Sequence, residues 1–256
     1  MKKLSRRQII LGLGAAGTGS LLAPFISLKG NSASITPSKL PTCIVYPEQT
    51  EGPFYFAANL IRKDITEGRP GTLLDLKLRI VNAESCTPIQ DAIVDIWSCD
   101  AAGEYSGYET VYSPQGEFLE QKGLPKDQQK HANDNRPQFH EEPNNEKKFM
   151  RGAQVTNAEG EVEFLTIYPG WYPDRAPHIH IKVYVNDSEV FTSQMYFDEE
   201  NTDRIYQQEV YSQKKGNRLR NNEDNIFSNI DNSPIVDITE VENGVIGTCT
   251  FGVRTG

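Results

Sequence analysis

Positive charge is scarce over most of this chain. The sequence holds 26 lysines and arginines against 35 aspartates and glutamates, and five of the bases lie in the first 33 residues, where there is no acid. The remainder is strongly acidic, which argues against nucleic acid or an anionic membrane as a partner and is typical of an ordinary solvated surface. The chain also lacks an internal repeat of about 20–50 residues, which disfavours a solenoid or a propeller.

The N-terminus has the pattern of an export signal. A basic region, residues 1–7, precedes a weakly apolar run over residues 9–28 that glycines interrupt. Residues 5–11, SRRQIIL, resemble a twin-arginine signal. A general-secretory signal and an uncleaved membrane anchor are the alternatives.

We therefore expect residues 1–33 to direct export and residues 34–256 to form one domain. The expected location is the periplasm or the medium. The expected partners are the twin-arginine machinery, transiently, and no stable membrane partner after cleavage near Ala33.

Cysteine is scarce as well, with four residues: Cys43, Cys86, Cys99 and Cys249. None forms a Cys-x-x-Cys pair, which disfavours a zinc site. An even number in an exported chain permits two disulfides, of which three pairings exist. We expect Cys86 with Cys99 and Cys43 with Cys249, and buried free thiols are the alternative.

Seven segments have the composition or alternation of strands. They are residues 74–81, 92–98, 152–156, 162–167, 178–185, 190–197 and 244–253. They predict an all-β fold, a single β-sandwich with long loops. A short helix is expected around residues 202–211. The polar stretches 106–148 and 213–232 are predicted as long loops that either wall a pocket or are solvated insertions, and we expect His131 and His140 to be solvated.

One predicted strand carries two histidines on the same face. His178 and His180 would lie roughly 7 Å apart at a rise of about 3.3 Å per residue, while Ile179 points into the core. Tyr172 precedes them across a proline-rich turn, so its phenol can fold back toward both imidazoles. This set predicts a mononuclear metal site. Taken alone, a His-x-His pair more often lies on the surface, or forms hydrogen bonds in the interior, than binds a metal.

Five ordered motifs extend this pattern. They are Thr50–Tyr55 (TEGPFY), Ile96-Trp97 with Asp100-Ala101-x-Gly103-x-Tyr105, Pro169-Gly170-x-Tyr172-Pro173, Arg175-x-Pro177-His178-Ile179-His180, and Ser193–Phe197 (SQMYF). In this order they resemble the intradiol ring-cleavage dioxygenases, over about residues 43–253. The resemblance implies the transthyretin- or immunoglobulin-like sandwich of that family.

The resemblance also implies roles for single residues. Tyr105, Tyr172, His178 and His180 would hold a non-haem Fe(III). Arg175 would stabilise negative charge that develops on the substrate, with Gln194 beside it, and Tyr172 would also move a proton. A small aromatic diol and O2 would be the substrates, and a cis,cis-muconate-type diacid the product. Trp97 we expect to be a core residue.

Two departures from the family pattern matter. Only five residues separate Tyr172 from His178, fewer than in protocatechuate-cleaving members, so this pocket wall is remodelled and the preferred diol is open. The segment before the sandwich is too short for the helical dimerisation domain of cytoplasmic catechol-cleaving members, so dimerisation by that route is not expected.

Two other functions compete with this one. A cupin is disfavoured because no histidine follows His180 and because Val185 stands about where its glutamate would fall. An exported sandwich that binds metal or an aromatic ligand without turnover is the second alternative. Both tyrosines and Arg175 favour catalysis, although Arg175 could instead pair with Asp174 or Glu163 on the surface.

Overall fold

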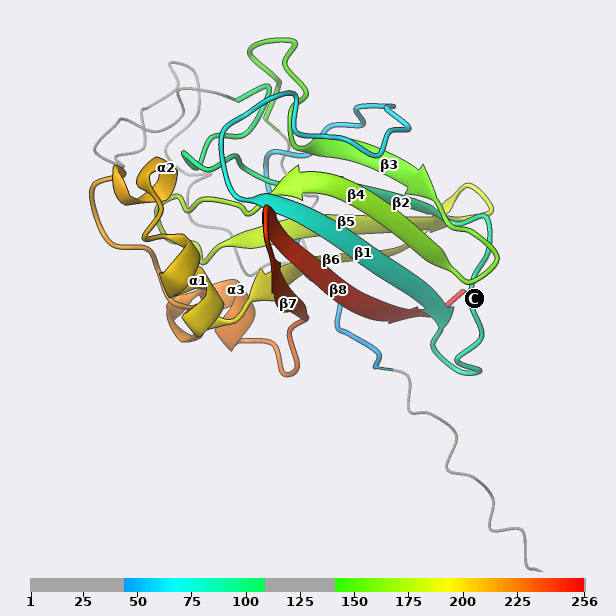
Figure 1. The fold of residues 1–256 in the computed structure, drawn as a ribbon. Coiled ribbons are helices and arrows are strands. Elements are labelled where there is room, and N and C mark those ends of the chain that lie inside the picture. The colour runs from blue at the N-terminus through cyan, green and yellow to red at the C-terminus, as the bar shows by residue number, and fades with distance from the viewer. Residues whose placement is uncertain (1–43, 109–140, 256) are drawn as a thin grey trace, which may run out of the picture. The chain divides into compact units, whose positions relative to one another are not determined.

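Two layers of four strands make up the fold (Figure 1). The computed structural model describes residues 44–108 and 141–255. In these residues the strands are β1 (Leu73–Asn82), β2 (Ile93–Trp97), β3 (Arg151–Val155), β4 (Glu161–Ile167), β5 (His178–Val185), β6 (Ser188–Phe197), β7 (Ile235–Val241) and β8 (Gly244–Val253). Their order is β3-β2-β5-β6 in one layer and β7-β8-β1-β4 in the other, and only two residue pairs between β6 and β7 join the layers. The predicted all-β sandwich is confirmed.

Alternation along each strand builds the core between the layers. In β1 the side chains of Leu74, Leu76, Leu78 and Ile80 are buried, while the charged residues between them face outward. In β5 the residues Ile179, Ile181 and Val183 enter the same core. This spacing of two places one face of each strand against the opposite layer.

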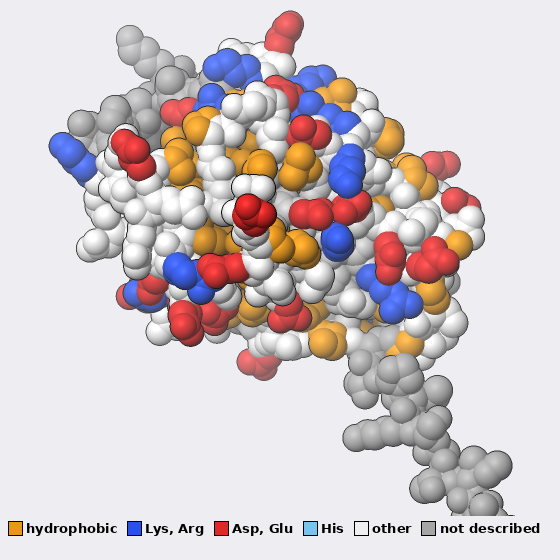
Figure 2. All heavy atoms as spheres, viewed as in Figure 1, with side chains coloured by type: hydrophobic (Ala, Val, Ile, Leu, Met, Phe, Trp, Pro, Cys, Tyr) orange, Lys and Arg blue, Asp and Glu red, His pale blue; other side chains and the backbone are white. Residues whose placement is uncertain are grey.

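The outer face of β1 and β4 carries charges of both signs. Lys77 lies 3.7 Å from carboxylate oxygens of both Asp75 and Glu163, and Lys63 lies 2.6 Å from Glu163. Figure 2 shows acidic and basic side chains interspersed over this side of the molecule. Exposed pairs of this kind contribute little stability, about 0–1 kcal/mol each.

Strand β7 is the one described strand that the sequence did not predict. Of its seven residues only Val236 is buried, so the apolar alternation that marks the other strands is weak. β7 is held instead by its backbone, antiparallel to β8 and parallel to the end of β6. Hydrogen bonding by the backbone leaves no trace in side-chain periodicity.

The helix expected around residues 202–211 is helical in the structure, but as two short helices and not one. Helix α1 (Glu199–Ile205) starts earlier, since the Asp198 carboxylate caps the amides of Glu200 and Asn201, and α2 (Glu209–Ser212) follows after a break. The loop predicted over residues 213–232 contains a 3-10 turn (Asn221–Glu223) and helix α3 (Asn225–Ser228). The three helices gather at one end of the strands (Figure 1).

The predicted disulfide pairing is wrong. Cys99 and Cys249 are buried free thiols, and Cys86 is disulfide-bonded. Cys86 and Cys99 lie beyond opposite ends of β2, whose five residues alone span about 16 Å, far more than the roughly 7 Å between Cα atoms that a disulfide allows.

Several sequence predictions lie outside the described residues. They concern the export signal, its cleavage site, His131 and His140. All described residues belong to one compact unit, Pro41–Gly256. In the described part of the chain, no helix is long and apolar enough to cross a membrane.

Candidate metal centre

The two histidines sit at the start of β5, between β2 and β6. His180 pairs with Trp97 of β2 on one side and with Gln194 of β6 on the other, and His178 pairs with Tyr196. Trp97 is a core residue, as predicted, with 1% of its surface exposed. Its ring also stacks on the His180 imidazole, with centroids 4.7 Å apart and planes 6° from parallel. Trp97 therefore fixes the plane of one of the two imidazoles.

Four donor atoms from three chain segments converge beside these histidines. His178 Nε2 lies 3.1 Å from His180 Nε2, 3.1 Å from the Tyr172 hydroxyl and 3.4 Å from the Tyr105 hydroxyl. Tyr105 follows β2, and Tyr172 follows β4. All four side chains are buried. The structure thus brings together the four residues that the sequence singled out as metal ligands.

The hydrogen bond of His178 leaves its Nε2 atom available to a metal. His178 Nδ1 lies 2.6 Å from the Ala176 carbonyl oxygen, so Nδ1 carries the hydrogen and the Nε2 lone pair points toward the phenols. His180 Nδ1 is buried and has no hydrogen-bond partner among the described residues. The two Nε2 atoms lie 3.1 Å apart, close enough to share a proton or to bind one cation.

The chemistry of the donors indicates a hard, highly charged ion. Within residues 44–108 and 141–255, no group of three His, Cys, Asp or Glu side chains could hold a metal, so the phenol oxygens are needed to complete a ligand set. Two phenolates and two imidazoles suit a trivalent ion such as Fe(III), because anionic oxygen matches its charge. The residues present fit that ion.

Burial favours the neutral forms of His178, His180 and Tyr105 without a metal. Burial, with help from the Arg175 cation, lowers the pKa of His178 to about 3. Burial and the neighbouring His178 hold the pKa of His180 well below its ordinary value. Burial and then the negative charge of Tyr172 raise the pKa of Tyr105 well above its ordinary value. A bound cation would reverse this balance and displace the phenol proton.

Arg175 and Gln194 lie next to the four donors. Arg175 Nη1 is 3.4 Å from the Tyr172 hydroxyl, and Nη2 donates to Gln194 Oε1 and, at 3.2 Å, to the Tyr196 hydroxyl. Gln194 is fixed in turn, because its amide nitrogen donates to the Thr50 carbonyl at 2.8 Å. The alternative pairing of Arg175 with Asp174 or Glu163 is wrong, because its carboxylate partner is Asp224 at 2.9 Å.

Asp224 and Tyr196 are the two neighbours of Arg175 to which the sequence assigned no role. Asp224 lies in a stretch predicted as an irregular loop, and its place before a short helix could have predicted a helix cap but not an ion pair with a residue 49 positions away. Tyr196 belongs to the motif Ser193–Phe197, but the sequence does not predict which group its hydroxyl contacts.

The segment Thr50–Tyr55 covers the centre. Gly52 has φ +76°, and a Cβ there would lie 3.4 Å from His180 Cε1. The Phe54 ring lies 4.9 Å from the Tyr105 ring, and the Tyr55 ring lies 4.7 Å from the Trp97 ring. Glu51 forms a buried ion pair with Lys182 of β5. This segment therefore packs against the ligands and is tied to the strand that carries two of them.

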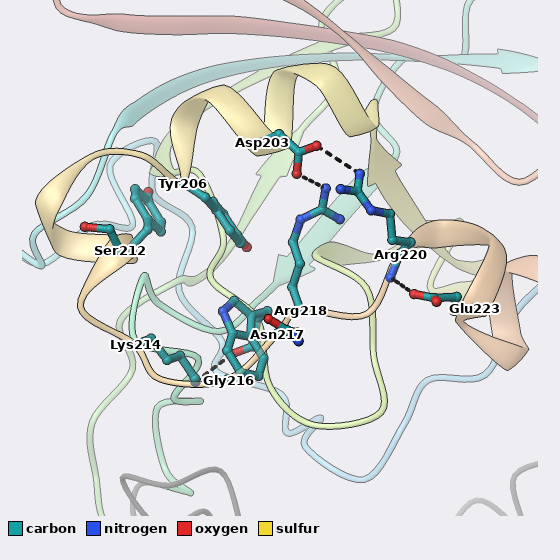
Figure 3. A pocket seen from close by; sticks show the side chains of 11 residues that line it. Asp203, Tyr206, Ser212, Lys214, Gly216, Asn217, Arg218, Arg220 and Glu223 are labelled. Carbon is teal, nitrogen blue, oxygen red and sulfur yellow. Dashed lines mark hydrogen bonds and ion pairs between the residues drawn. The ribbon is translucent and has the colours of Figure 1, made fainter.

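A separate cavity of about 470 Å³ opens beside the helices (Figure 3). Figure 3 shows Arg218 and Arg220 pointing at Asp203, with nitrogen-to-oxygen distances of 2.6 and 2.9 Å. Trp171, next to the candidate ligand Tyr172, lines the same cavity. Both arginines of this cavity are already paired with acids.

Comparison with solved structures identifies the fold and the family. An intradiol ring-cleavage dioxygenase from Tetranychus urticae has 30% sequence identity and a TM-score of 0.70, and the match covers 83% of this chain and 95% of that one. The dioxygenase domain of a carbohydrate-binding fusion protein from Streptomyces sp. SirexAA-E matches at 22% identity and a TM-score of 0.56, over 83% of this chain and 100% of that one.

Hydroxyquinol 1,2-dioxygenase from Pseudomonas putida DLL-E4 has the same fold at 12% identity and a TM-score of 0.55, with 84% of this chain and 68% of that one covered. A scan of protein-family models found no match. A search of curated proteins found none either. The agreement with the Tetranychus urticae enzyme in fold, extent and sequence shows that this chain belongs to the intradiol ring-cleavage dioxygenases.

Proposed function

We propose that this enzyme uses Fe(III) and O2 to open an ortho-dihydroxylated aromatic ring between its two hydroxyl-bearing carbons. Both oxygen atoms of O2 would enter the product, so that a catechol-type diol becomes a cis,cis-muconate-type diacid. The observation that carries this proposal is the convergence of two phenol oxygens and the His180 Nε2 atom within 3.4 Å of His178 Nε2.

Tyr105, Tyr172, His178 and His180 would hold the iron. Two phenolates would cancel two of its three positive charges, which lowers the cost of placing the ion in this buried site. An Fe(III) ion bound there would supply a Lewis acid that favours the deprotonated form of the diol, whose ring is more electron-rich toward O2 than that of the neutral diol.

Arg175 would supply a fixed positive charge beside the reacting ring. Its guanidinium is held by Gln194, Tyr196 and Asp224, so little reorganisation is needed when negative charge develops. Although burial alone would lower its pKa, the nearby Tyr172, Tyr196 and Asp224 raise the pKa of Arg175 above its ordinary value, so the group stays charged. Gln194 would position Arg175.

Tyr172 would accept a proton from the diol. Its oxygen faces both His178 and Arg175 Nη1, and a cation at this distance stabilises the phenolate form that has to receive the proton. Phe54 and Tyr108, which belong to the same aromatic cluster as both candidate tyrosine ligands, would keep water from the ring.

We also propose that the chain acts outside the cytoplasm after twin-arginine export. Residues 5–11 support this proposal, and so does the disulfide of Cys86, because disulfides persist mainly in oxidising compartments. A signal that exports folded proteins would suit an enzyme whose metal has to be bound first.

Colour and O2 uptake test the function together. Purified protein loaded with iron should be red-brown from tyrosinate-to-iron charge transfer, and it should consume O2 with at least one of catechol, hydroxyquinol or protocatechuate, giving a ring-opened diacid by mass spectrometry. Colour without O2 uptake on any diol would favour the non-catalytic binding protein. Colourless protein with full iron content would remove the tyrosines from the ligand set.

A further inference from the structure

Asp224 uses its two carboxylate oxygens for two different tasks. Oδ1 accepts hydrogen bonds from the amides of Ile226 and Phe227, at 2.8 and 3.3 Å, and thereby caps α3. Oδ2 accepts from Arg175 Nε at 2.9 Å and from the Ala176 amide at 2.8 Å. The side chain is 1% exposed. One carboxylate thus connects the helical end of the fold to the loop between Tyr172 and His178.

The planar guanidinium makes this contact directional. Nε faces Asp224, Nη2 faces Gln194 and Tyr196, and Nη1 faces the Tyr172 hydroxyl. Because the nitrogens of a guanidinium lie in one rigid plane, fixing the Nε edge and Nη2 also fixes the direction of Nη1. The partners come from β6 and from the residue before α3, so Arg175 is held from two separate elements.

A capping role alone does not explain the geometry at Asp224. Asp198 caps α1 in the same way, accepting from the amides of Glu200 and Asn201 at 2.9 and 3.2 Å, and it is exposed. A capping carboxylate therefore needs neither to be buried nor to place its second oxygen against an arginine. Burying a carboxylate is costly unless it is paired, and Arg175 is the cation that pairs with it.

We propose that Asp224 is a positioning residue that acts through Arg175, holding Nη1 toward the Tyr172 oxygen and toward a diol bound beside it. This inference rests on the proposed ring-opening function. It assigns to the loop before α3 a part in the reaction, although no atom of Asp224 touches the four candidate ligands in the hydrogen bonds described.

Single-substitution kinetics on the iron-loaded full chain provide the first test. Asp224→Asn keeps an oxygen for the cap and removes the charge, and we expect kcat to fall about 10- to 100-fold, as for other residues that orient a ligand from behind, with KM, iron content and the visible band unchanged. The matched control Asp198→Asn should change kcat by less than about 2-fold. Asp224→Glu, which keeps the charge, should recover part of the loss.

A double-mutant cycle then asks whether the effect passes through Arg175. With Arg175→Leu already present, adding Asp224→Asn should lower kcat by less than about 2-fold further. Unchanged kcat in Asp224→Asn, or a full additional loss in the Arg175→Leu background, would overturn the proposal. Loss of iron from Asp224→Asn would also overturn the proposal. It would show that the Asp224 carboxylate positions the loop that carries the metal ligands and does not act through Arg175.

A measurement without turnover separates this inference from the proposed function. In metal-free full chain, ¹⁵N NMR should show the Arg175 Nε–H exchanging with solvent at least about 10-fold faster in Asp224→Asn than in Asp198→Asn. Equal exchange in both variants would contradict the Asp224 contact, whatever the activity. If this result holds but wild-type protein neither colours nor consumes O2, the function fails and the contact stands.

Discussion

Tyr105 and Tyr172 present the same phenol to the centre, but their surroundings differ. Tyr105 lies under the Phe54 ring, at a centroid distance of 4.9 Å, and burial holds the pKa of its phenol well above the ordinary value. The Tyr172 oxygen lies 3.4 Å from Arg175 Nη1. Tyr172 therefore has a fixed cation beside it that favours its phenolate, the form that can accept a proton.

Replacing Tyr172 by Phe should weaken or shift the visible band and lower turnover at least about 100-fold, because both a metal ligand and a proton acceptor are removed. Absorbance and O2 uptake measure the two effects. Tyr108→Phe is a matched control, since Tyr108 is buried in the same aromatic cluster but its hydroxyl donates to the Glu141 carbonyl at 2.9 Å. An unchanged spectrum and rate in Tyr172→Phe would exclude it from the ligand set.

Asp95 gives a prediction about pH and stability. It lies on β2, opposite Lys182 of β5, and accepts a hydrogen bond from Tyr55 at 3.1 Å. Burial raises its pKa from 3.8 to about 6, although the Tyr55 hydrogen bond and the Arg151 charge oppose the shift. Between these values the folded chain keeps a proton that the unfolded chain has lost, so stability falls as pH rises through this window.

Asp95→Asn removes this ionisation and keeps an oxygen for Tyr55. Relative to wild type, the variant should gain about 1–3 kcal/mol in the free energy of unfolding between pH 4 and pH 7.5. Urea unfolding of both proteins at the two pH values measures the gain. A stability difference that does not change with pH would show that folding does not raise the pKa of Asp95.

At the scale of elements, β5 is covered on both faces. Ile179, Ile181 and Val183 lie in the core, while the opposite face carries His178, His180 and Lys182. The segment Thr50–Tyr55 lies over that polar face, held by the Glu51 ion pair with Lys182 and by the Gln194 hydrogen bond to Thr50. A segment distant in sequence thus determines how much room remains above His180.

Gly52→Ala should test this arrangement. The substitution puts a side chain at positive φ and a Cβ 3.4 Å from His180 Cε1, so we expect a loss of about 1 kcal/mol in stability together with a changed visible spectrum. Gly68→Ala is the matched control, because Gly68 has φ +72° but nothing within 4 Å of its added Cβ. Thermal unfolding and absorbance compare the two variants, and identical spectra would show that Gly52 does not crowd the ligand.

At the scale of the whole molecule, the centre forms only when both layers of the sandwich are assembled. His178 and His180 belong to the β2–β5 layer, Tyr105 follows β2, and Tyr172 follows β4 of the other layer. A metal held by all four side chains would stabilise the fold over a span of 76 residues, since such a site does not exist in the unfolded chain.

Seven of the eight described strands could be predicted from sequence, because their residues have the composition or the alternation of strands. β7 could not be predicted, since its partners hold it by backbone hydrogen bonds.

The candidate ligands could be predicted because His178, His180 and Tyr172 are close in sequence and Tyr105 belongs to one of the five ordered motifs. The role of Asp224 could not be predicted, because two residues that pair across 49 positions leave no pattern in the sequence around either of them. The pairing of Cys86 with Cys99 failed although the sequence already predicted a strand over residues 92–98 that separates the two cysteines.

The export prediction also concerns the whole chain. Replacing both Arg6 and Arg7 by lysine should abolish export, because the twin-arginine pathway reads that pair, and the protein should remain in the cytoplasm. Cell fractionation followed by immunoblotting measures the distribution, with a single Lys2→Arg variant as the charge-neutral control. Normal export of the double variant would indicate the general-secretory route.

The two buried thiols give this protein internal reporters of local opening. Cys99 lies in the aromatic cluster beside the centre, and Cys249 lies in the core on β8; burial raises the pKa of each to about 12. Neither thiol can react at neutral pH while enclosed, so its labelling rate by a thiol reagent measures how often its surroundings open. Comparing the two rates with and without metal would show whether the ion stiffens only its own neighbourhood or the entire sandwich.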